Sequence, residues 1–445
     1  MCLETYKATR SASLASQLTT SVKESANMQQ EQNEQGKMAY WKKIIVMFCL
    51  GWTVIWIYRT ILNPVLPEIQ ADLGVTSDTS MGMIFSVFFF AYTAMQIPSG
   101  LLADKFGRKT IIIPGFILFT IGALLVGFST SLMFILIASF ITGLGQGTYY
   151  GPAYSITSET IPQEKRGIST AIINSGSALG MAIGLIGSSF LVKDMGIDWR
   201  VLLFITAALS FSMMIVFARN IKQQKALIAN AAGKDDDNPQ EKASFKTLLT
   251  NPRMIACYVL YFATCYGYYM IVTWLPSYLQ TERGFTGSAI GFAAALVAFS
   301  AVPGSLFFSR LSDKFNKKKI TFIITLELLA AGMLFLTVSV QTTTLLIVCL
   351  VLYGFLGKLA VEPILISYVA DIAPKKGIGT TFGVFNFFGM MSSVLAPLVT
   401  GLISDATGSK VLGFYLATII IIIGATFMLI TNLRNKPQGP NTVSS

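Results

Sequence analysis

The chain has 445 residues, of which 53% are hydrophobic and only 12% are charged, and its net charge is +11. Soluble domains usually carry about 25% charged residues, so this composition excludes an ordinary soluble protein. Histidine is absent, which excludes a His-dependent catalytic triad and a His-ligated metal site. The cysteines show no metal or disulfide spacing. We therefore expect no metal, no cofactor and no enzymatic activity.

Apolar runs of about 20 residues, the length that crosses a bilayer, follow one another along most of the chain. The first 40 residues contain no apolar core and are not a signal peptide; we expect a disordered tail, or an over-extended start with translation beginning at Met28 or Met38. A polar stretch containing "KDDDNPQEK" divides the runs into two sets of six. The expected organisation is an all-α membrane protein with a tail (1–40), a six-helix bundle (41–218), a cytoplasmic linker (219–253), a second six-helix bundle (254–433) and a tail (434–445). The twelve predicted spans are 44–66, 80–102, 110–128, 132–156, 168–191, 201–218, 254–278, 288–309, 320–340, 344–369, 378–404 and 411–432.

The basic residues are distributed unevenly between the two sides of these spans. With the N-terminus inside, the outer loops hold only Lys193, Arg200, Arg283 and Lys410. An excess of Lys and Arg on one side is the positive-inside asymmetry. The charge therefore predicts a multi-pass protein of the cell membrane with both termini cytoplasmic, and it does not indicate nucleic-acid binding.

The two sets of spans share landmarks at the same places. "GLLADKFGRKT" (Gly100–Thr110) follows the second span, and "SRLSDKFNKKK" (Ser309–Lys319) follows the eighth, so Asp-Lys-Phe recurs 209 residues later. Later in each half an acid is followed by proline and a basic pair: Glu159, Pro162, Lys165 and Arg166, then Asp371, Pro374, Lys375 and Lys376. A repeat of this kind is typical of transporters built from two related halves.

The first landmark, Gly100-x-x-x-Asp104-x-x-Gly107-Arg108-Lys109, resembles the loop signature of the major facilitator superfamily, and the resemblance covers residues 40–435. It implies the twelve-helix major facilitator fold and transport by alternating access. Acids and bases at helix ends on one face of the membrane can form a charge-assisted network that latches the cytoplasmic side; the alternative is that the basic residues only set topology. The predicted cytoplasmic gate consists of Gly100, Asp104, Gly107, Arg108, Glu159, Arg166, Asp313 and Asp371.

Three stretches resemble one branch of that superfamily, the anion:cation symporters of organic anions. They are "CYGYYMIVTWLPSYLQTERGFT" from Cys265, "GLGQGTYYGPA" from Gly143 and "GTTFGVFNFFG" from Gly379. Drug/proton antiporters resemble the chain less, because their proline-containing fifth-span motif is missing. The resemblance implies a small organic anion substrate, such as a sugar acid or an aromatic acid, with a proton or sodium ion as the coupling ion.

One charge stands inside the first predicted span. No charged residue occurs from Ile44 to Tyr58, and then Arg59 follows, although an arginine at the centre of a membrane helix costs roughly 2.5–3.5 kcal/mol. Trp52, Trp56, Arg59 and Asn63 share one helical face, and a planar fork of donors suits a carboxylate. The alternative is that Arg59 pairs with an internal acid such as Glu362. The candidate substrate-binding residues are Arg59, Trp56, Tyr92, Gln146, Tyr150, Asn174, Tyr261, Tyr269 and Asn386.

The coupling ion stays open at this stage, because the chain departs from the family pattern at two positions. Tyr58 stands where the family has a proton-handling Asp, and Gln146 stands where Glu is common; neither side chain takes up a proton near neutral pH. The remaining intramembrane charges are Glu327, Lys358 and Glu362, and they are the candidate coupling residues. Lys358 and Glu362 are spaced i, i+4 and can also form a static pair.

Other functions remain to be weighed against an anion symporter. A drug or aromatic-compound efflux carrier would also use an aromatic cavity, and a non-transporting sensor would need a signalling domain, for which the tail and linker are too short. Phosphate esters are less favoured than carboxylates, because the seventh span lacks a second arginine. We expect a monomer in the lipid bilayer.

Overall fold

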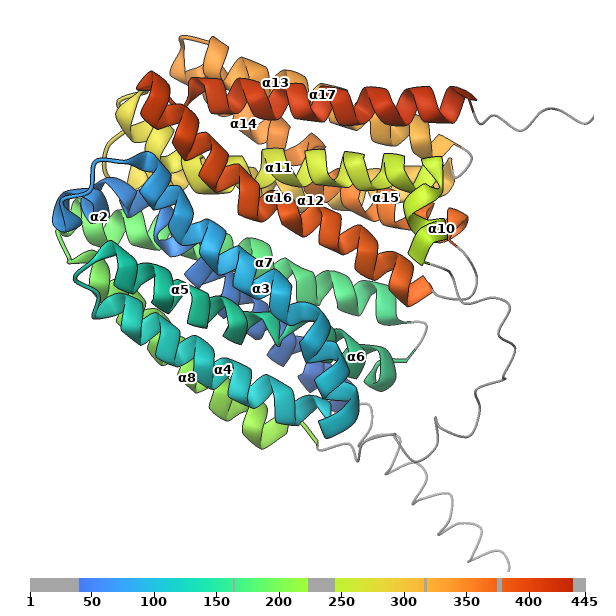
Figure 1. Ribbon diagram of the computed structural model, residues 1–445, viewed down its shortest axis with the longest axis horizontal. Coiled ribbons are helices and arrows are strands. Elements are labelled where there is room, and N and C mark those ends of the chain that lie inside the picture. The colour runs from blue at the N-terminus through green and yellow to red at the C-terminus, as the bar shows by residue number, and fades with distance from the viewer. Residues whose placement is uncertain (1–39, 163–164, 223–244, 316–317, 374–377, 435–445) are drawn as a thin grey trace, which may run out of the picture.

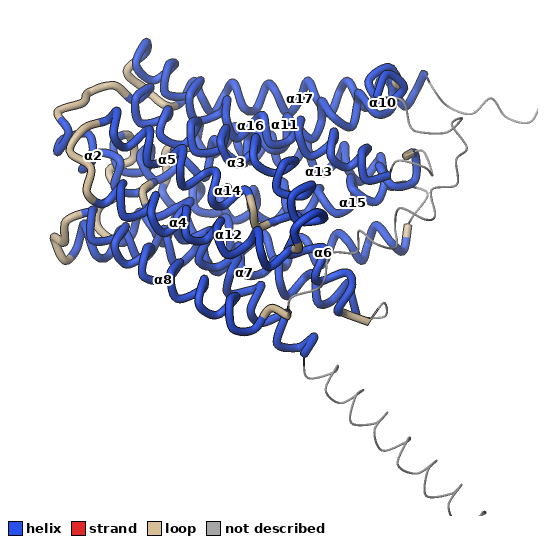
Figure 2. The backbone as a smooth tube through the Cα atoms, turned by 60° about the horizontal axis from the view of Figure 1, so that its bottom comes forward, coloured by secondary structure: helices blue, strands red, loops and turns tan. Residues whose placement is uncertain are grey.

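The computed structural model describes residues 40–162, 165–222, 245–315, 318–373 and 378–434. Within those ranges the regular elements are helices, with no strand (Figures 1 and 2). This described part contains twelve helical segments that are long and apolar enough to cross a membrane. The prediction of an all-α membrane protein with twelve spans is therefore confirmed. The predicted tails, apart from Tyr40 and Arg434, and residues 223–244 of the predicted linker lie outside the described residues.

Some spans are single helices, and others are built from consecutive shorter ones. The first span, Tyr40–Leu73, is helical over residues 40–61 and continues through η1 (Asn63–Val65) and α2 (Leu66–Leu73). A short helix, α10, occupies part of the stretch predicted as linker. The other elements are α3 (Asp78–Phe106), α4 (Arg108–Gly127), α5 (Leu132–Gly147), α6 (Tyr150–Thr160), α7 (Arg166–Ser188), η3 (Ser189–Asp194), α8 (Trp199–Asn220), α10 (Phe245–Thr250), α11 (Pro252–Thr281), α12 (Ser288–Lys314), α13 (Lys319–Ser339), α14 (Thr343–Leu356), α15 (Lys358–Ile372), α16 (Ile378–Thr407) and α17 (Val411–Arg434).

Local chemistry sets both ends of α3. The helix begins after Ser77, whose hydroxyl accepts a hydrogen bond from the Ser80 N–H at 3.2 Å, the usual role of a serine N-cap. It ends at Gly107, where φ is 91°, a value that glycine adopts without steric cost. Helix α4 starts at the next residue. The second glycine of the loop motif therefore allows the chain to turn sharply between the second and third spans.

Small residues bring α4 and α5 into backbone contact. A methyl group added at Gly145 would lie 2.5 Å from the Phe119 nitrogen and 2.6 Å from the Gly115 carbonyl oxygen. No side chain fits in that space. Close approach through small residues is the usual way in which membrane helices pack, because lipid supplies no hydrophobic driving force between them.

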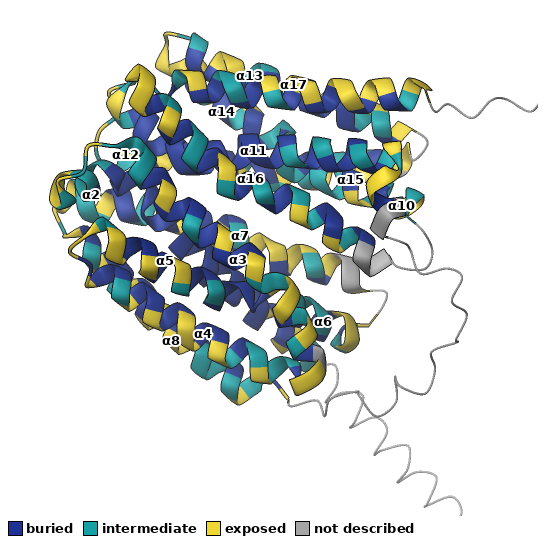
Figure 3. Ribbon diagram, in the orientation of Figure 1, coloured by how far each residue is buried: buried dark blue, intermediate teal, exposed yellow. Residues whose placement is uncertain are grey.

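The helices form two groups that face each other across one interface (Figure 1). In the first group α5 packs against α3 and α4, and α4 packs against α8; in the second, α11 packs against α16 and α17. The groups meet where α3 packs against α16 and α7 against α12. Buried residues concentrate inside and between the groups (Figure 3), and many exposed side chains are large and hydrophobic, as a surface against lipid requires.

The two groups are joined by polar contacts at the end of the molecule opposite to the linker, which we call the far end. Lys410 Nζ pairs with Asp78 at 2.8 Å. The Asp405 carboxylate accepts hydrogen bonds from the Ser77 hydroxyl and from the backbone N–H groups of Asp78 and Thr79, at 2.6–3.0 Å. An acid at the end of α16 therefore caps the N-terminus of α3 in the other group, where negative charge is favourable.

The helical element η3, which follows α7, adds two more far-end contacts between the groups. Lys193 Nζ donates to Gln280 Oε1 at 2.7 Å, and Asp194 accepts the Ser288 N–H at 3.1 Å. The name far-end cluster is used below for Asp78, Lys193, Asp194, Asp405 and Lys410. Among the described residues at the linker end, by contrast, the ion pairs lie within one group or the other.

Two spans are interrupted at corresponding positions of the two halves. The fourth span breaks between Gly147, the last residue of α5, and Tyr150, the first of α6. The tenth span breaks at Gly357, between α14 and α15. Interrupted backbone at membrane depth is tolerated only inside protein or along a water-filled cavity. Both breaks therefore mark the inner wall of the molecule.

Candidate substrate-binding site

Arg59 lies in the membrane interior and is 5% exposed. Its Nε donates a hydrogen bond to Gln146 Oε1 of α5 at 3.0 Å. Arg59 Nη2 and Gln146 Nε2 are both buried, and neither has an acceptor among the described residues. Buried donors without acceptors are costly. A carboxylate only accepts hydrogen bonds, so one bound at these two side chains would satisfy both donors.

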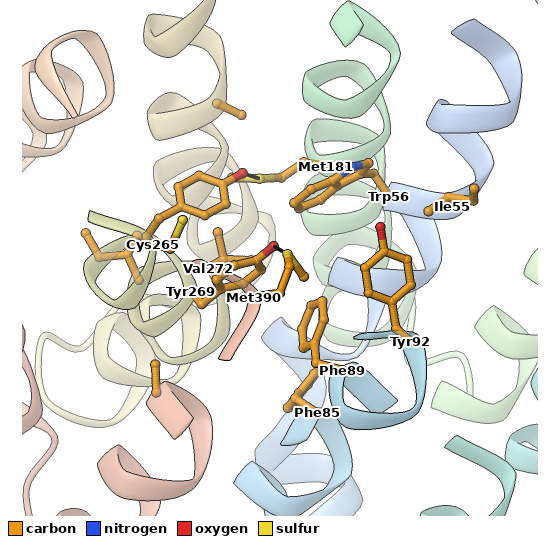
Figure 4. Packing of buried hydrophobic residues seen from close by; sticks show 14 of the residues in the cluster. Ile55, Trp56, Phe85, Phe89, Tyr92, Met181, Cys265, Tyr269, Val272 and Met390 are labelled. Atoms are coloured by element: carbon orange, nitrogen blue, oxygen red, sulfur yellow. Dashed lines mark hydrogen bonds between the residues drawn. The ribbon is translucent and has the colours of Figure 1, made fainter. Parts of the chain in front are cut away.

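Aromatic rings surround the guanidinium of Arg59. The distances from its Cζ to the five ring centres run from 4.3 to 5.9 Å. Figure 4 shows three of these residues, Trp56, Phe89 and Tyr92, around one space between the two groups. Cation–π attraction is worth up to about 2 kcal/mol for a desolvated pair, so the rings help to hold the arginine without neutralising its charge. The rings belong to Trp52, Trp56, Phe88, Phe89 and Tyr92.

The alternative in which Arg59 pairs with Glu362 does not occur in this structure. Glu362 instead accepts hydrogen bonds from Lys358 Nζ at 2.9 Å and from the Tyr261 hydroxyl. Among the described side chains Arg59 forms no ion pair. The arginine therefore carries an uncompensated charge, and its polar partner is the neutral amide of Gln146.

Lys358 and Glu362 face the same region from the second group. Lys358 begins α15 at the break of the tenth span, and its Nζ lies 5.2 Å from the centre of the Tyr268 ring. The Tyr268 ring is in turn 6.3 Å from the Trp56 ring, which belongs to the cage around Arg59. Tyr268 therefore lies next to both the predicted coupling pair and the aromatic cage around the predicted anion anchor.

Two more predicted binding residues lie where the groups meet. The Tyr269 ring is 4.9 Å from the Phe89 ring, and its hydroxyl points at the Met390 sulfur (Figure 4). Asn386 Nδ2 donates to Gln96 Oε1 of α3 at 2.8 Å. Both side chains therefore link the second group to the first beside the aromatic cage.

The remaining two, Tyr150 and Asn174, lie toward the linker end. Tyr150 is 43% exposed, and its ring is 6.2 Å from that of Trp52. Asn174 is exposed and accepts a hydrogen bond from Tyr154; it makes no contact with the cage among the described residues. On the other side of Arg59, Asn63 is fully buried. The residues around Arg59 are therefore buried toward Asn63 and partly exposed toward Tyr150.

Glu327 is separated from the other intramembrane charges. It is 1% exposed on α13 and accepts a hydrogen bond from the Thr264 hydroxyl of α11. Within the described residues, no hydrogen bond or ion pair joins it to Lys358 or Glu362. The structure therefore places it in the packing of the second group and outside the cage.

At the linker end, each half holds an ion pair of the same design. Arg108, at the start of α4, forms two hydrogen bonds with the carboxylate of Glu159 near the end of α6. Lys319, at the start of α13, pairs with Asp371 near the end of α15 at 2.6 Å. The side chains of Asp104, Arg166 and Asp313 lie outside the described residues, as do Pro374, Lys375 and Lys376. A methyl group added at Gly100 would meet nothing within 4 Å.

Sequence reasoning missed several of these contacts. Lys319 closes the basic run of the second landmark, so the repeat itself offered a signal for its pairing. For Asp78 and Asp405 there was none, because residues more than 300 positions apart meet only after folding. Asn63 was placed on the Arg59 face, but its Nδ2 donates to the Val272 carbonyl at 2.6 Å, so it joins the two halves at positions 209 residues apart.

Known transporters resemble this chain over most of its length. The probable galactarate/D-glucarate transporter GudP of Bacillus subtilis is 27% identical over 395 residues, which cover 82% of this chain and 86% of that one. The probable sulfoacetate transporter SauU of Cupriavidus necator is 27% identical (87% and 93%), and the D-galactonate transporter of Escherichia coli is 24% identical (87% and 94%).

The fold also matches a solved structure. A bacterial homologue of the human lysosomal transporter Spinster, crystallised in an inward-facing and occupied conformation, superposes with a TM-score of 0.72 over 88% of this chain and 97% of that one, at 16% identity. The family model of the Major Facilitator Superfamily matches residues 48–397 and 258–444. The resemblance seen in the loop motif is thereby confirmed, and the chain is a membrane transporter that belongs to the major facilitator superfamily.

Proposed function

We propose that this protein carries a small organic carboxylate across the cell membrane by alternating access, and that Arg59 and Gln146 bind the carboxylate group. The observation that carries the proposal is the pair of buried donors, Arg59 Nη2 and Gln146 Nε2, which lack acceptors in the described structure. The names of the relatives support it, because galactarate, D-glucarate, D-galactonate and sulfoacetate are all organic acids.

The rest of the proposed site suits a polar organic molecule. Aromatic faces can pack against carbon-bound hydrogens, and tyrosine hydroxyls and amide side chains can bond to hydroxyl groups. A sugar acid and an aromatic acid both meet these conditions. The side chains that would form this wall are Trp56, Tyr92, Tyr150, Asn174, Tyr261, Tyr269 and Asn386.

Net uptake of an anion needs a source of energy. Moving one negative charge inward against 100 mV costs about 2.3 kcal/mol, so we propose that net uptake is coupled to a cation. Glu362 is the candidate proton site, because it is an intramembrane acid whose side chain is 22% exposed. The positive-inside asymmetry supports placing the linker end, and with it both termini, in the cytoplasm.

The decisive test is a substrate screen on the purified protein. Thermal stability in detergent would be measured with sugar acids, aromatic acids and small aliphatic acids, each beside its uncharged amide or alcohol, followed by uptake of labelled hits into proteoliposomes. We expect stabilisation and uptake with a subset of the acids and none with their neutral analogues. Stabilisation by neutral or cationic aromatic compounds instead would overturn the proposal in favour of a drug efflux carrier.

A further inference from the structure

We infer that the protein works chiefly as an anion exchanger, in which one acid leaves as another enters. This inference rests on the proposed function and concerns the charge of the empty site. Arg59 is 5% exposed, and its hydrogen-bond partner among the described residues is the uncharged Gln146. Lys358 is already neutralised by Glu362 at 2.9 Å. Within the described residues, the empty site therefore carries one uncompensated positive charge.

This charge affects the reorientation of the empty carrier and of the loaded carrier differently. A carrier passes between its two states through a conformation in which both ends are closed and the site is out of contact with water. Burying an unpaired charge is expensive, whereas burying a charge beside its counter-ion is much less so. The rings around Arg59 attract the cation but have no net charge of their own. A bound monoanion supplies the missing charge, so the loaded carrier reorients faster than the empty one.

Gln146 lies beside Arg59, and because its side chain is a neutral amide it supplies no counter-charge to the arginine. Its Oε1 lies 3.0 Å from Arg59 Nε, so a glutamate of nearly the same size would place a carboxylate against the guanidinium. Such an acid would neutralise the empty site and favour its return. It would also repel the substrate carboxylate, so binding would weaken.

The first test compares two efflux rates of wild-type protein. Proteoliposomes are loaded with labelled D-galactonate, or with the labelled acid best taken up in the screen described above, and diluted into medium with or without the same unlabelled acid. We expect efflux at least about tenfold faster into the acid-containing medium, equivalent to about 1.4 kcal/mol in the barrier. Like-for-like exchange moves no net charge, so a valinomycin-imposed potential should leave that rate unchanged. Equal efflux into both media would overturn the inference.

The second test asks whether the missing counter-charge is the cause. In Gln146→Glu we expect the rate of exchange to fall to within about twofold of the rate of net efflux. Gln146→Met, which adds no charge, should bind the acid more weakly because it loses a donor to the carboxylate, but exchange should stay much faster than net efflux. A transporting Gln146→Glu protein with an unchanged ratio would overturn the inference. If that variant does not fold, the wild-type rates decide. Failure of every acid to move at all would instead overturn the proposed function.

Discussion

Arg59 combines three features: a hydrogen bond to a neutral amide, a cage of aromatic rings and a donor atom with no acceptor among the described residues. Each feature depends on the planar guanidinium, because an ammonium group offers neither a flat face nor a two-pronged edge. A substitution by lysine keeps the positive charge and removes the planar guanidinium, so it tests whether the shape of the group matters apart from its charge.

Replacing Arg59 with lysine should lower acid uptake at least about tenfold while the protein remains folded. The positive charge is kept, so membrane insertion changes little, but a charge-assisted hydrogen bond worth about 1.5–3 kcal/mol is lost. Uptake into proteoliposomes and the melting temperature of the purified variant give the two readouts. Arg200→Lys is the matched control, because Arg200 pairs with Asp72 at the far end, and it should transport normally. Near-normal uptake by Arg59→Lys would remove Arg59 as the anion anchor.

Glu362 allows a second residue-scale prediction. Glu362→Gln should lose accumulation driven by a pH gradient and retain exchange of the acid, because the amide still accepts a hydrogen bond but cannot bind a proton. A purely structural pair predicts otherwise: Glu362→Gln would be unstable, since removing one partner of a buried pair costs about 3–5 kcal/mol, and Lys358→Met with Glu362→Gln would restore transport. Accumulation assays on both variants separate the two outcomes.

At the scale of helices, apolar runs predicted the spans well because a membrane helix satisfies its backbone within one segment. The breaks were not predicted. The predicted tenth span, 344–369, runs across Gly357 without an interruption, and "GLGQGTYYGPA" does not say where α5 stops. A helix can break where the backbone carbonyl and N–H groups that it releases have other hydrogen-bond partners. Those partners depend on the neighbouring helices and not on the local sequence. The Arg59–Gln146 bond was missed as a contact for the same reason, although each residue was a candidate.

Helix packing makes its own prediction at Gly145. Gly145→Ala should destabilise the protein by roughly 1–3 kcal/mol, the usual cost of an added methyl group in a tight interior, because its Cβ would press on the backbone of α4. Gly332→Ala is the control: Gly332 is also within a helix, and nothing lies within 4 Å of the position of its Cβ. Thermal unfolding monitored by tryptophan fluorescence should show a lower midpoint for the first variant alone. Equal midpoints would show that α4 and α5 can separate without cost.

At the scale of the whole molecule, the repeat and the charge asymmetry indicated two related halves and an orientation in the membrane. They did not predict which end of the molecule is closed. The four basic residues of the outer loops were interpreted only as the small number that the positive-inside asymmetry allows on the outer side of the membrane. Two of them, Lys193 and Lys410, join the groups in the far-end cluster. The orientation of the protein in the membrane depends on how many basic residues lie on each side. Closure of the far end depends instead on which charged residues contact one another, and helix packing decides those contacts.

Disrupting the far-end cluster should shift the carrier toward opening at the far end. Asp405→Ala removes the cap on α3 and leaves its first N–H groups without an acceptor. The readout is labelling by a membrane-impermeant maleimide of a cysteine placed at Ser86, which is buried at the interface and bonds to the Val394 carbonyl, with the native cysteines replaced. Labelling should become faster. Asp198→Ala, which removes the cap of α8 within one group, should leave the rate unchanged; equal rates in both variants would argue against a closing role.

The interface between the groups has a consequence for how the chain is connected. Its described contacts, α3 with α16, α7 with α12, Asn63 with Val272 and the far-end cluster, all join residues before 223 to residues after 244. None of them requires a peptide bond between those positions. In terms of the contacts that hold them together, the two groups meet as two subunits of a dimer would, and joining them in one polypeptide raises the effective concentration of each at the other.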